Sequence, residues 1–463
     1  MLQILRREPG FYRRLLALAL PIALQNIISI SLSFADTFMV GLLGNAEMAA
    51  VSAANTPLNV VYMAIFGFQN GMSVLVSQYW GQNDTKSISR CFGIAIYAIA
   101  ALSSLVALTC FFFPDQIMGL ITPNPALIAP GVRYIRLAGI SCFFNSLSSV
   151  YASLQRSTEN PTFGVAMFTS SMALNTTLNY ILIFGKLGLP AMGVFGAALA
   201  TLISRIVECT ICLAHAFISK RMPLHLRCIL HPGKLILRSF IKYSTPVICS
   251  ETLWGLAASL TTVILGHMAN SQDMLAAKTL AGNITTFSTV AYIGIAAASA
   301  VIIGSEIGRG SSRDTVYSIG RTLLLTVTLA GVALGALLLV LLYVFFRPIL
   351  YPLFQLTESA TRITDYMIVI FAPTLPLHSY NVTAITGILR AGGDVKAAAW
   401  IDNVPLMLLT IPLMALFALV LDTPIWLVCL ISNSEAIFKL PLTVLRFRSK
   451  KWINDVTQTT KQP

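Results

Sequence analysis

The sequence predicts an all-α polytopic membrane protein with twelve transmembrane helices in two pseudo-symmetric six-helix bundles. Three observations support this fold class. Hydrophobic residues make up 56% of the 463 residues and charged residues 11%, whereas a soluble domain carries about 25% charged residues. The chain contains twelve apolar runs, each long enough for the roughly 20 residues that cross a bilayer as a helix. Its two halves are also related in sequence.

The twelve runs account for most of the chain. The basic segment MLQILRREPGFYRR precedes a first run that is too long for a cleaved signal peptide, so we expect a retained first helix. Pro21, Pro246, Pro376 and Pro412 fall inside runs, where each frees a backbone carbonyl and permits a kink. The runs lie near 15–43, 50–79, 91–113, 132–154, 161–185, 192–219, 238–268, 275–307, 316–346, 362–389, 396–421 and 424–447.

Basic residues are distributed unevenly between the two sides of the predicted membrane. An even number of spans puts both termini on one side, and the loops there hold most of the Lys and Arg residues, among them Arg6, Arg7, Lys220 and the tail RFRSKK. By the positive-inside rule we expect both termini in the cytoplasm and the chain in the plasma (inner) membrane. The formal net charge of +13 then reflects topology and contact with membrane lipids rather than a nucleic-acid partner.

The repeat is visible when Pro21 is aligned with Pro246. The stretch PIALQNIISISLSFADTFMVG then falls on PVICSETLWGLAASLTTVILG, and LQRSTEN further along falls on LRAGGD. Six helices per unit preserve the sense of insertion, which indicates a parallel repeat about an axis along the membrane normal. We expect an N-terminal lobe over 1–219, a cytoplasmic linker over 220–237 and a C-terminal lobe over 238–463.

Motifs for enzyme chemistry are absent from the sequence. It contains no GxxxxGK[ST] phosphate loop, no HExxH and no GxSxG, and the eight cysteines show no zinc-binding spacing. We therefore expect a protein that is not an enzyme and needs no cofactor. Its energy must come from an ion gradient or from a partner.

Acidic and amide residues at membrane depth mark a candidate ion site in the N-terminal half. Asp36 lies inside an apolar run, where a carboxylate costs about 2.5–3.5 kcal/mol. Asn175 and Asn179 are four residues apart and share a helix face. Their amides could supply oxygen ligands to a cation or hydrogen bonds to the carboxyl group. Tyr134 could add a hydroxyl group. The alternative is that the asparagines only join helices.

The C-terminal half offers different acids. Glu251 lies on its first helix and Asp402 near the start of its fifth, and either could bind a proton or a sodium ion. A solvated interfacial acid is the alternative for Asp402. Acids on the last helix of each half have a basic residue on the same helix, which indicates internal pairing with a structural or gating role. These pairs are Glu208 with Arg205 and Glu435 with Lys439.

The combined motifs resemble the multidrug and toxic compound extrusion (MATE) family. The resemblance rests on ADTFMVGLLG with AAVSAANTP, on GMSVLVSQYWGQND, on NTTLNYILIFGKLGLPAMGVFGAALATLISR and on LRAGGD. It covers essentially the whole chain. It implies two six-helix bundles forming a V and drug efflux driven by entry of sodium ions or protons.

The resemblance also implies roles for single residues. Asp36 falls on the first-helix aspartate that the family uses for coupling, and Asn175 and Asn179 fall on a fifth-helix polar pair. Tyr134 matches a fourth-helix tyrosine, and Glu251 is similar to the glutamate of the family's C-terminal cation site. The resemblance therefore implies a possible sodium site at Asp36 or at Glu251.

One position departs from the pattern. Some sodium-coupled members carry a tenth-helix aspartate where this chain has Ser379. This puts a complete C-terminal sodium site in doubt, unless Asp402 replaces the missing acid from the next helix.

Two functions stay open. The first is a secondary active multidrug efflux antiporter that exports organic, mostly cationic, drug-like compounds in exchange for protons or sodium ions by alternating access. The second is a lipid-linked precursor flippase of the same superfamily, which would need a cavity lined with Arg and Lys for pyrophosphate. The charges at membrane depth are mainly acidic, which favours cationic cargo. We expect a monomer.

Overall fold

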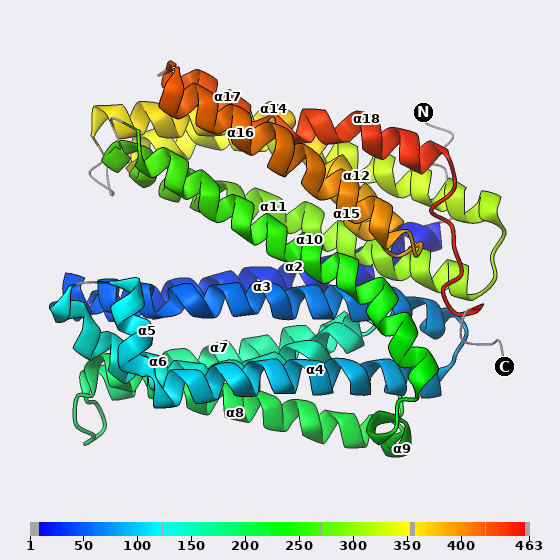
Figure 1. Ribbon diagram of the computed structural model, residues 1–463, viewed down its shortest axis with the longest axis horizontal. Helices are drawn as coiled ribbons and strands as arrows, with labels where there is room; N and C mark the ends of the chain where they lie inside the picture. The colour runs from blue at the N-terminus through cyan, green and yellow to red at the C-terminus, as the bar shows by residue number, and fades with distance from the viewer. Residues whose placement is uncertain are drawn as a thin grey trace. The chain divides into compact units, whose positions relative to one another are not determined.

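The computed structural model describes residues 9–122, 124–219, 221–268, 271–351, 357–421 and 423–458 as a succession of helices (Figure 1). Arg6, Arg7 and Lys220, which entered the orientation prediction, lie outside the described residues. The helices of the first half are α2 (Pro9–Gly41), α3 (Asn45–Gly81), α4 (Thr85–Phe112), α5 (Pro114–Ile121), α6 (Pro125–Ser157), α7 (Pro161–Phe184), α8 (Gly193–Ile218) and the short α9 (Leu226–Leu230).

The second half also consists of long helices, and several of them contain π-helical turns. The helices are α10 (Lys234–Gly266), α11 (Ser271–Gly308), α12 (Arg313–Leu341) with η1 (Leu342–Leu350), and α14 (Glu358–Val382) with η2 (Thr383–Leu389). They continue with α15 (Val395–Val404), η3 (Pro405–Thr410), α16 (Ile411–Ala415), η4 (Leu416–Val420), α17 (Ile425–Asn433) and α18 (Glu435–Arg448).

Eleven helical segments of the described chain are long and apolar enough to cross a membrane, and they coincide with eleven of the twelve predicted runs. The remaining run, 161–185, is also one uninterrupted helix, α7. Its middle reads TSSMALNTTLN and is too rich in Ser, Thr and Asn for it to join the eleven. The less apolar helix is thus the one that carries Asn175 and Asn179.

Prolines interrupt the regular helix in the eleventh predicted span. Pro405 begins η3 and Pro412 lies at the start of α16, so α-helical and π-helical turns alternate there. A proline has no N–H for the i−4 carbonyl, and a π-turn accommodates the loss. Asp402 lies one turn before Pro405, in the last regular turns of α15.

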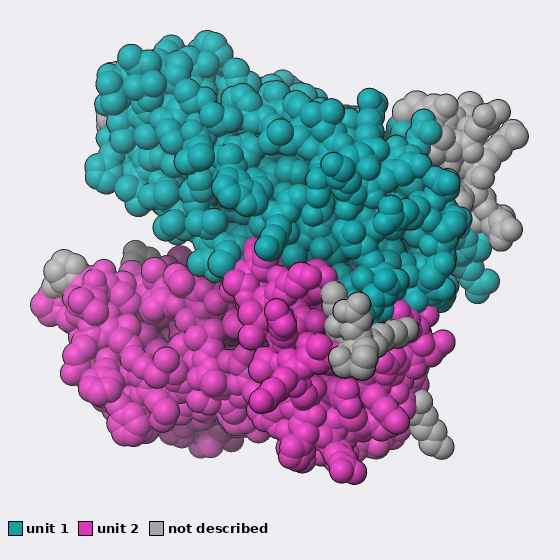
Figure 2. Space-filling view, turned by 45° about the vertical axis from the view of Figure 1, so that its right-hand side comes forward, with its two compact units in different colours: residues 1–23, 249–458 teal, residues 24–248, 459–463 magenta. Residues whose placement is uncertain are grey.

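The chain divides into two compact units (Figure 2). Unit 1 comprises residues 1–23 and 249–458, and unit 2 comprises residues 24–248 and 459–463. The divisions fall inside two helices. The beginning of α2 belongs to unit 1 and the rest of α2 to unit 2, whereas α10 begins in unit 2 and continues in unit 1.

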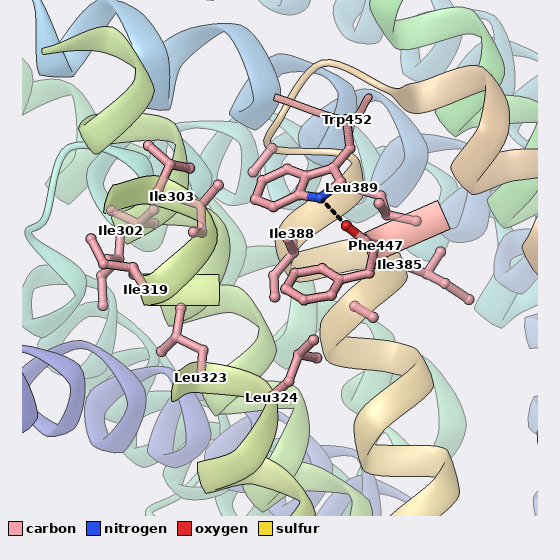
Figure 3. Close-up of a cluster of buried hydrophobic side chains, with 14 of the residues drawn as sticks. Ile302, Ile303, Ile319, Leu323, Leu324, Ile385, Ile388, Leu389, Phe447 and Trp452 are labelled. Carbon is pink, nitrogen blue, oxygen red and sulfur yellow. Dashed lines mark hydrogen bonds between the residues drawn. The ribbon is translucent and has the colours of Figure 1, made fainter. Parts of the chain in front are cut away.

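Unit 1 has a large apolar core at the end of α18. Trp452, which is fully buried, donates its indole N–H to the backbone oxygen of Phe447 at 3.0 Å (Figure 3). The two rings stack at 5.6 Å between centroids. They pack against aliphatic side chains of α11, α12 and η2, which fixes the segment from Phe447 to Trp452 onto three helices. These side chains include Ile302, Ile303, Ile319, Leu323, Leu324, Ile385, Ile388 and Leu389.

Candidate ion-coupling site

The polar residues of unit 2 form a continuous hydrogen-bonded cluster. Asn179 donates its Nδ2 group to Asp36 Oδ1 at 2.6 Å and to Asn175 Oδ1 at 3.0 Å. Asn175 in turn donates to Thr201 Oγ1 on α8 at 3.3 Å. Both asparagines are buried, at 2% and 1% exposure, and Asp36 is partly buried. The structure therefore brings Asp36, Asn175 and Asn179 together as the sequence predicted.

Two close helix contacts hold this cluster in place. Gly164 on α7 leaves room for the amide of Gln25 on α2, and Gln25 donates to the backbone oxygen of Pro161. This contact fixes α2 beside α7. A side chain at Gly196 would lie 2.7 Å from the backbone oxygen of Leu182, so its absence lets α8 approach α7. Both contacts depend on a missing Cβ at a crossing point.

The cluster can bind a cation in two ways. A proton needs only the carboxylate of Asp36. A sodium ion would also need neutral oxygens, and the cluster offers Thr201 Oγ1 and Asn179 Oδ1, which is buried without a hydrogen-bond partner in the described chain. Among the residues that the structure describes, no group of three or more His, Cys, Asp or Glu side chains could hold a metal ion.

Tyr134 lies beside this cluster rather than in its hydrogen-bond chain. Its hydroxyl donates to Asn55 Oδ1 at 3.4 Å. Its ring packs on a small apolar core that includes Val40 of α2 and Ile183 of α7. Tyr134 therefore packs against an apolar core to which the helices of Asp36 and Asn179 both contribute. The sequence predicted no role for Asn55.

A buried ion pair continues the polar face of α8. Arg205 donates through Nη1 to Glu208 Oε2 at 2.6 Å, and the Glu208 side chain is fully buried. The predicted internal pairing of these two residues is confirmed. Arg205 follows Thr201 by four residues, so both lie on the same face of α8.

The acids of unit 1 are joined by basic residues. Arg390, at the end of η2, donates to Glu251 on α10 and, at 3.1 Å each, to Ser250 Oγ and Asp402 Oδ2. Lys439 on α18 donates to Asp402 Oδ1 at 3.0 Å and lies 3.3 Å from Glu435. Arg390 and Lys439 are buried, with side chains 4% and 7% exposed.

This network gives the C-terminal acids a different setting from Asp36. Glu251 and Asp402 are brought together, but through Arg390, which supplies the positive charge that a sodium ion would otherwise bring. Ser379 lies fully buried and donates to the backbone oxygens of Val327 and Pro376. A role of Glu251, Asp402 and Ser379 in ion coupling stays a prediction.

Sequence reasoning missed the basic partners of these acids. Lys439 was paired only with Glu435, and Arg390 was seen only as part of the LRAGGD motif. It also missed Thr201 of the Asp36 cluster. The one local signal for Thr201 is its spacing of four residues from Arg205, which puts both on one face of a helix. For Arg390 and Asp402, which are 12 residues apart on different helices, no local periodicity predicts the contact.

Comparison with known proteins agrees with this architecture. The family model MatE matches residues 21–181 and 246–440. The uncharacterized transporter YisQ of Bacillus subtilis (strain 168) is 24% identical over 441 residues, covering 95% of this chain and 94% of YisQ. The multidrug resistance protein MdtK of Edwardsiella ictaluri (strain 93-146) is 24% identical over 466 residues, covering 95% of this chain and 97% of MdtK. A solved MATE structure in the bent conformation has a TM-score of 0.83 at 18% identity, covering 99% of both chains, which shows a shared fold.

Eleven helices long and apolar enough to cross a membrane, within the described residues, define a multi-pass membrane protein. The chain belongs to the MatE family, whose model matches in both halves of the sequence. The family resemblance deduced from the sequence motifs is therefore confirmed.

Proposed function

We propose that the protein is a secondary active multidrug efflux antiporter, which exports organic, mostly cationic compounds in exchange for protons or sodium ions. The observation that carries the proposal is the hydrogen bond between Asp36 and Asn179 inside a buried polar cluster. Relatives named multidrug resistance proteins, among them MdtK and NorM, support drug-like cargo. A monomer in the plasma membrane, with both termini in the cytoplasm, completes the proposal.

The cluster can couple two binding events because its charge depends on occupancy. With Asp36 ionised, the cluster carries a negative charge that attracts an organic cation. When Asp36 takes up a proton or a sodium ion, that attraction is lost and the cation leaves. A charge that crosses a 100 mV potential gains about 2.3 kcal/mol, and two conformations of such a protein differ by only a few kcal/mol. These energies are of the same size, so ion entry can drive alternating access.

The second candidate is a lipid-linked precursor flippase of the same superfamily. A solved MOP superfamily transporter from Pyrococcus furiosus, whose binding pocket of reverse polarity suggests a different function for that protein, has the same fold, with a TM-score of 0.83 at 18% identity. Anionic cargo needs basic side chains that are free to bind it. In unit 1 the buried Arg390 and Lys439 bind acids instead, which favours the antiporter.

Transport into everted membrane vesicles tests the proposal. Ethidium, an organic cation, is the cargo, and a proton gradient or a sodium gradient is imposed separately. We expect one of the gradients to drive uptake by the wild-type protein, and Asp36→Asn to abolish uptake while the protein remains folded. Glu358→Gln, which neutralises an acid whose side chain is 95% exposed, is the matched control and keeps wild-type uptake. Uptake at the wild-type rate by Asp36→Asn would refute the coupling role.

A further inference from the structure

We propose that unit 2 binds the phosphate group of an anionic phospholipid in a cavity between α4 and the start of α10. The cavity has a volume of about 190 Å³ and is lined from three parts of the chain: the end of α3, the first turns of α4 and residues 232–236. It shares no residue with the hydrogen-bonded cluster of Asp36, Asn175 and Asn179. The cavity is therefore a second site, separate from the candidate ion-coupling site.

Contacts between the linker and α4 fix the walls of the cavity (Figure 1). His225 donates its backbone N–H to Ser89 Oγ at 3.1 Å, and its ring Nε2 lies 3.2 Å from Thr85 Oγ1. A Cβ at Gly93 would lie 2.5 Å from the backbone oxygen of Ile229, so the glycine lets α9 lie directly on α4. These contacts hold the start of α10 beside the first turns of α4.

Arg90, which lines the cavity from α4, has no counter-charge. Its Nε atom is buried without a hydrogen-bond partner, and its guanidinium group makes no ion pair or hydrogen bond among the described residues. Asp84, the acid in the lining, is used as the cap of α4: its Oδ1 accepts from the Ser87 N–H at 3.0 Å and its Oδ2 from the Ser87 hydroxyl at 2.6 Å. A buried charged donor without a partner is costly, and an anion in the cavity would supply the missing partner.

The start of α10 adds hydrogen-bond donors to the same cavity. The first backbone bond of this helix runs from the Leu237 N–H to the Gly233 oxygen at 3.2 Å. The preceding N–H groups, those of Lys234, Leu235 and Ile236, line the cavity and have no acceptor in the part of the chain that the structure describes. Gly233 has a φ of +82°, which favours glycine, and a Cβ there would meet nothing within 4 Å. Free N–H groups at a helix start bind phosphate oxygens, and arginine binds them in a bidentate manner.

The charge of the lining indicates which kind of phosphate fits. Arg90 and Lys234 each carry one positive charge and Asp84 carries one negative charge, so the lining sums to plus one. A phosphodiester carries a single negative charge and neutralises the lining. A phosphomonoester carries about −1.5 to −2 at neutral pH and would leave an excess of negative charge. The cavity therefore favours the phosphodiester of a lipid headgroup.

Exposed leucines on α9 and on the first turn of α10 favour a lipid over a free phosphate. They are between 40% and 58% exposed and offer apolar surface to acyl chains: Leu226, Leu230, Leu235 and Leu237. Arg90 directly precedes the predicted run 91–113, so the cavity lies at the membrane surface and not at the depth of a transported cargo. In the proposed topology this is the cytoplasmic surface, where basic pockets bind anionic headgroups.

Native mass spectrometry of the detergent-solubilised protein tests the proposal by counting the lipid molecules that stay bound. The probe is dioleoyl-phosphatidylglycerol, and the comparison is dioleoyl-phosphatidylcholine, whose choline cancels the phosphate charge. We expect the wild type to retain one phosphatidylglycerol molecule more tightly than any further copy. Arg90→Gln should weaken this binding about tenfold or more, because a hydrogen bond between charged groups is lost. Lys86→Gln, which removes an exposed charge one turn earlier on α4 and outside the cavity lining, is the matched control and should keep wild-type binding.

The midpoint of thermal unfolding distinguishes the two sources of a phosphate group. Phosphatidylglycerol should raise the midpoint of the wild type but not that of Arg90→Gln, and inorganic phosphate at the same concentration should raise neither. A rise with inorganic phosphate alone would assign the site to free phosphate and overturn its lipid occupant. Equal retention of phosphatidylglycerol by the wild type and Arg90→Gln, or no preference over phosphatidylcholine, would overturn the proposal as a whole. Where Arg90→Gln does not fold, the exposed Lys234 decides: Lys234→Gln should weaken binding about fivefold.

Discussion

Replacing Arg390 by Met should destabilise unit 1 strongly. Arg390 donates to Glu251, Ser250 and Asp402 from a side chain that is only 4% exposed. Its removal leaves three acids, with Glu435 as the third, against Lys439 alone, so the charge of the network changes from minus one to minus two. Breaking a buried ion pair by removing one partner costs about 3–5 kcal/mol. We expect the free energy of unfolding to fall by that amount.

The assay is reversible unfolding in mixed micelles titrated with SDS and followed by tryptophan fluorescence. A second variant separates charge from packing: Arg390→Met combined with Glu251→Gln restores the charge of minus one. The double variant should recover about half of the lost free energy of unfolding. The other half is the cost of the hydrogen bonds that Ser250 and Asp402 no longer receive.

The control is Arg362→Met. This arginine pairs with Glu358 on the surface, where its side chain is 63% exposed, and an exposed pair contributes about 0–1 kcal/mol. A free energy of unfolding for Arg390→Met within about 1 kcal/mol of the wild type would refute the reasoning. The acids of unit 1 would then be supported by other contacts, and an ion-binding role for them would gain weight.

Two further substitutions test the packing and polarity of single positions. Asn179→Ala removes the 2.6 Å bond to Asp36 and should lower ethidium uptake into vesicles about tenfold or more, since a hydrogen bond to a charged group contributes about 1.5–3 kcal/mol. Gly331→Ala places a methyl group against Ser379 Oγ. It should lower the free energy of unfolding by about 1–3 kcal/mol. A methyl group at Gly282 meets nothing within 4 Å, so Gly282→Ala should not destabilise the protein.

The controls for these substitutions lie on the same helices or in the same unit. Thr177 is exposed on α7, and its hydroxyl donates to the backbone oxygen of Ala173 and to no other group among the described residues. Thr177→Ala should therefore keep wild-type uptake. Ethidium uptake by Asn179→Ala at the wild-type rate would mean that Asp36 works without its amide partner. Equal stability of Gly331→Ala and Gly282→Ala would mean that α12 can move away from α14 at little cost.

The membrane-spanning elements could be predicted because they depend on local composition. A run of about 20 apolar residues that crosses hydrocarbon forms a helix, because a helix satisfies all of its backbone hydrogen bonds within the run. The same reasoning predicted a helix over 161–185, where the structure has α7, although the Ser, Thr and Asn residues of α7 keep it out of the eleven segments that are long and apolar enough to cross a membrane. The shared face of Asn175 and Asn179 followed from helical periodicity.

Contacts between helices could not be predicted in the same way. Asn179 and Asp36 are 143 residues apart, and Arg390 and Glu251 are 139 residues apart. The sequence offered Asp36 and Glu251 as two different sites for a proton or a sodium ion, but no local pattern indicated the partner of either acid.

The sequence by itself determined the spans, the duplication and the acids at membrane depth, because hydropathy and periodicity are properties of short segments. Only the tertiary structure decided which acids already have a cation. Glu251 and Asp402 share Arg390, while Asp36 bonds to a neutral amide. The physical reason is that a buried charge takes the partner that packing brings within about 3 Å, and packing at crossings such as Gly164 and Gly196 depends on residues distant in the chain.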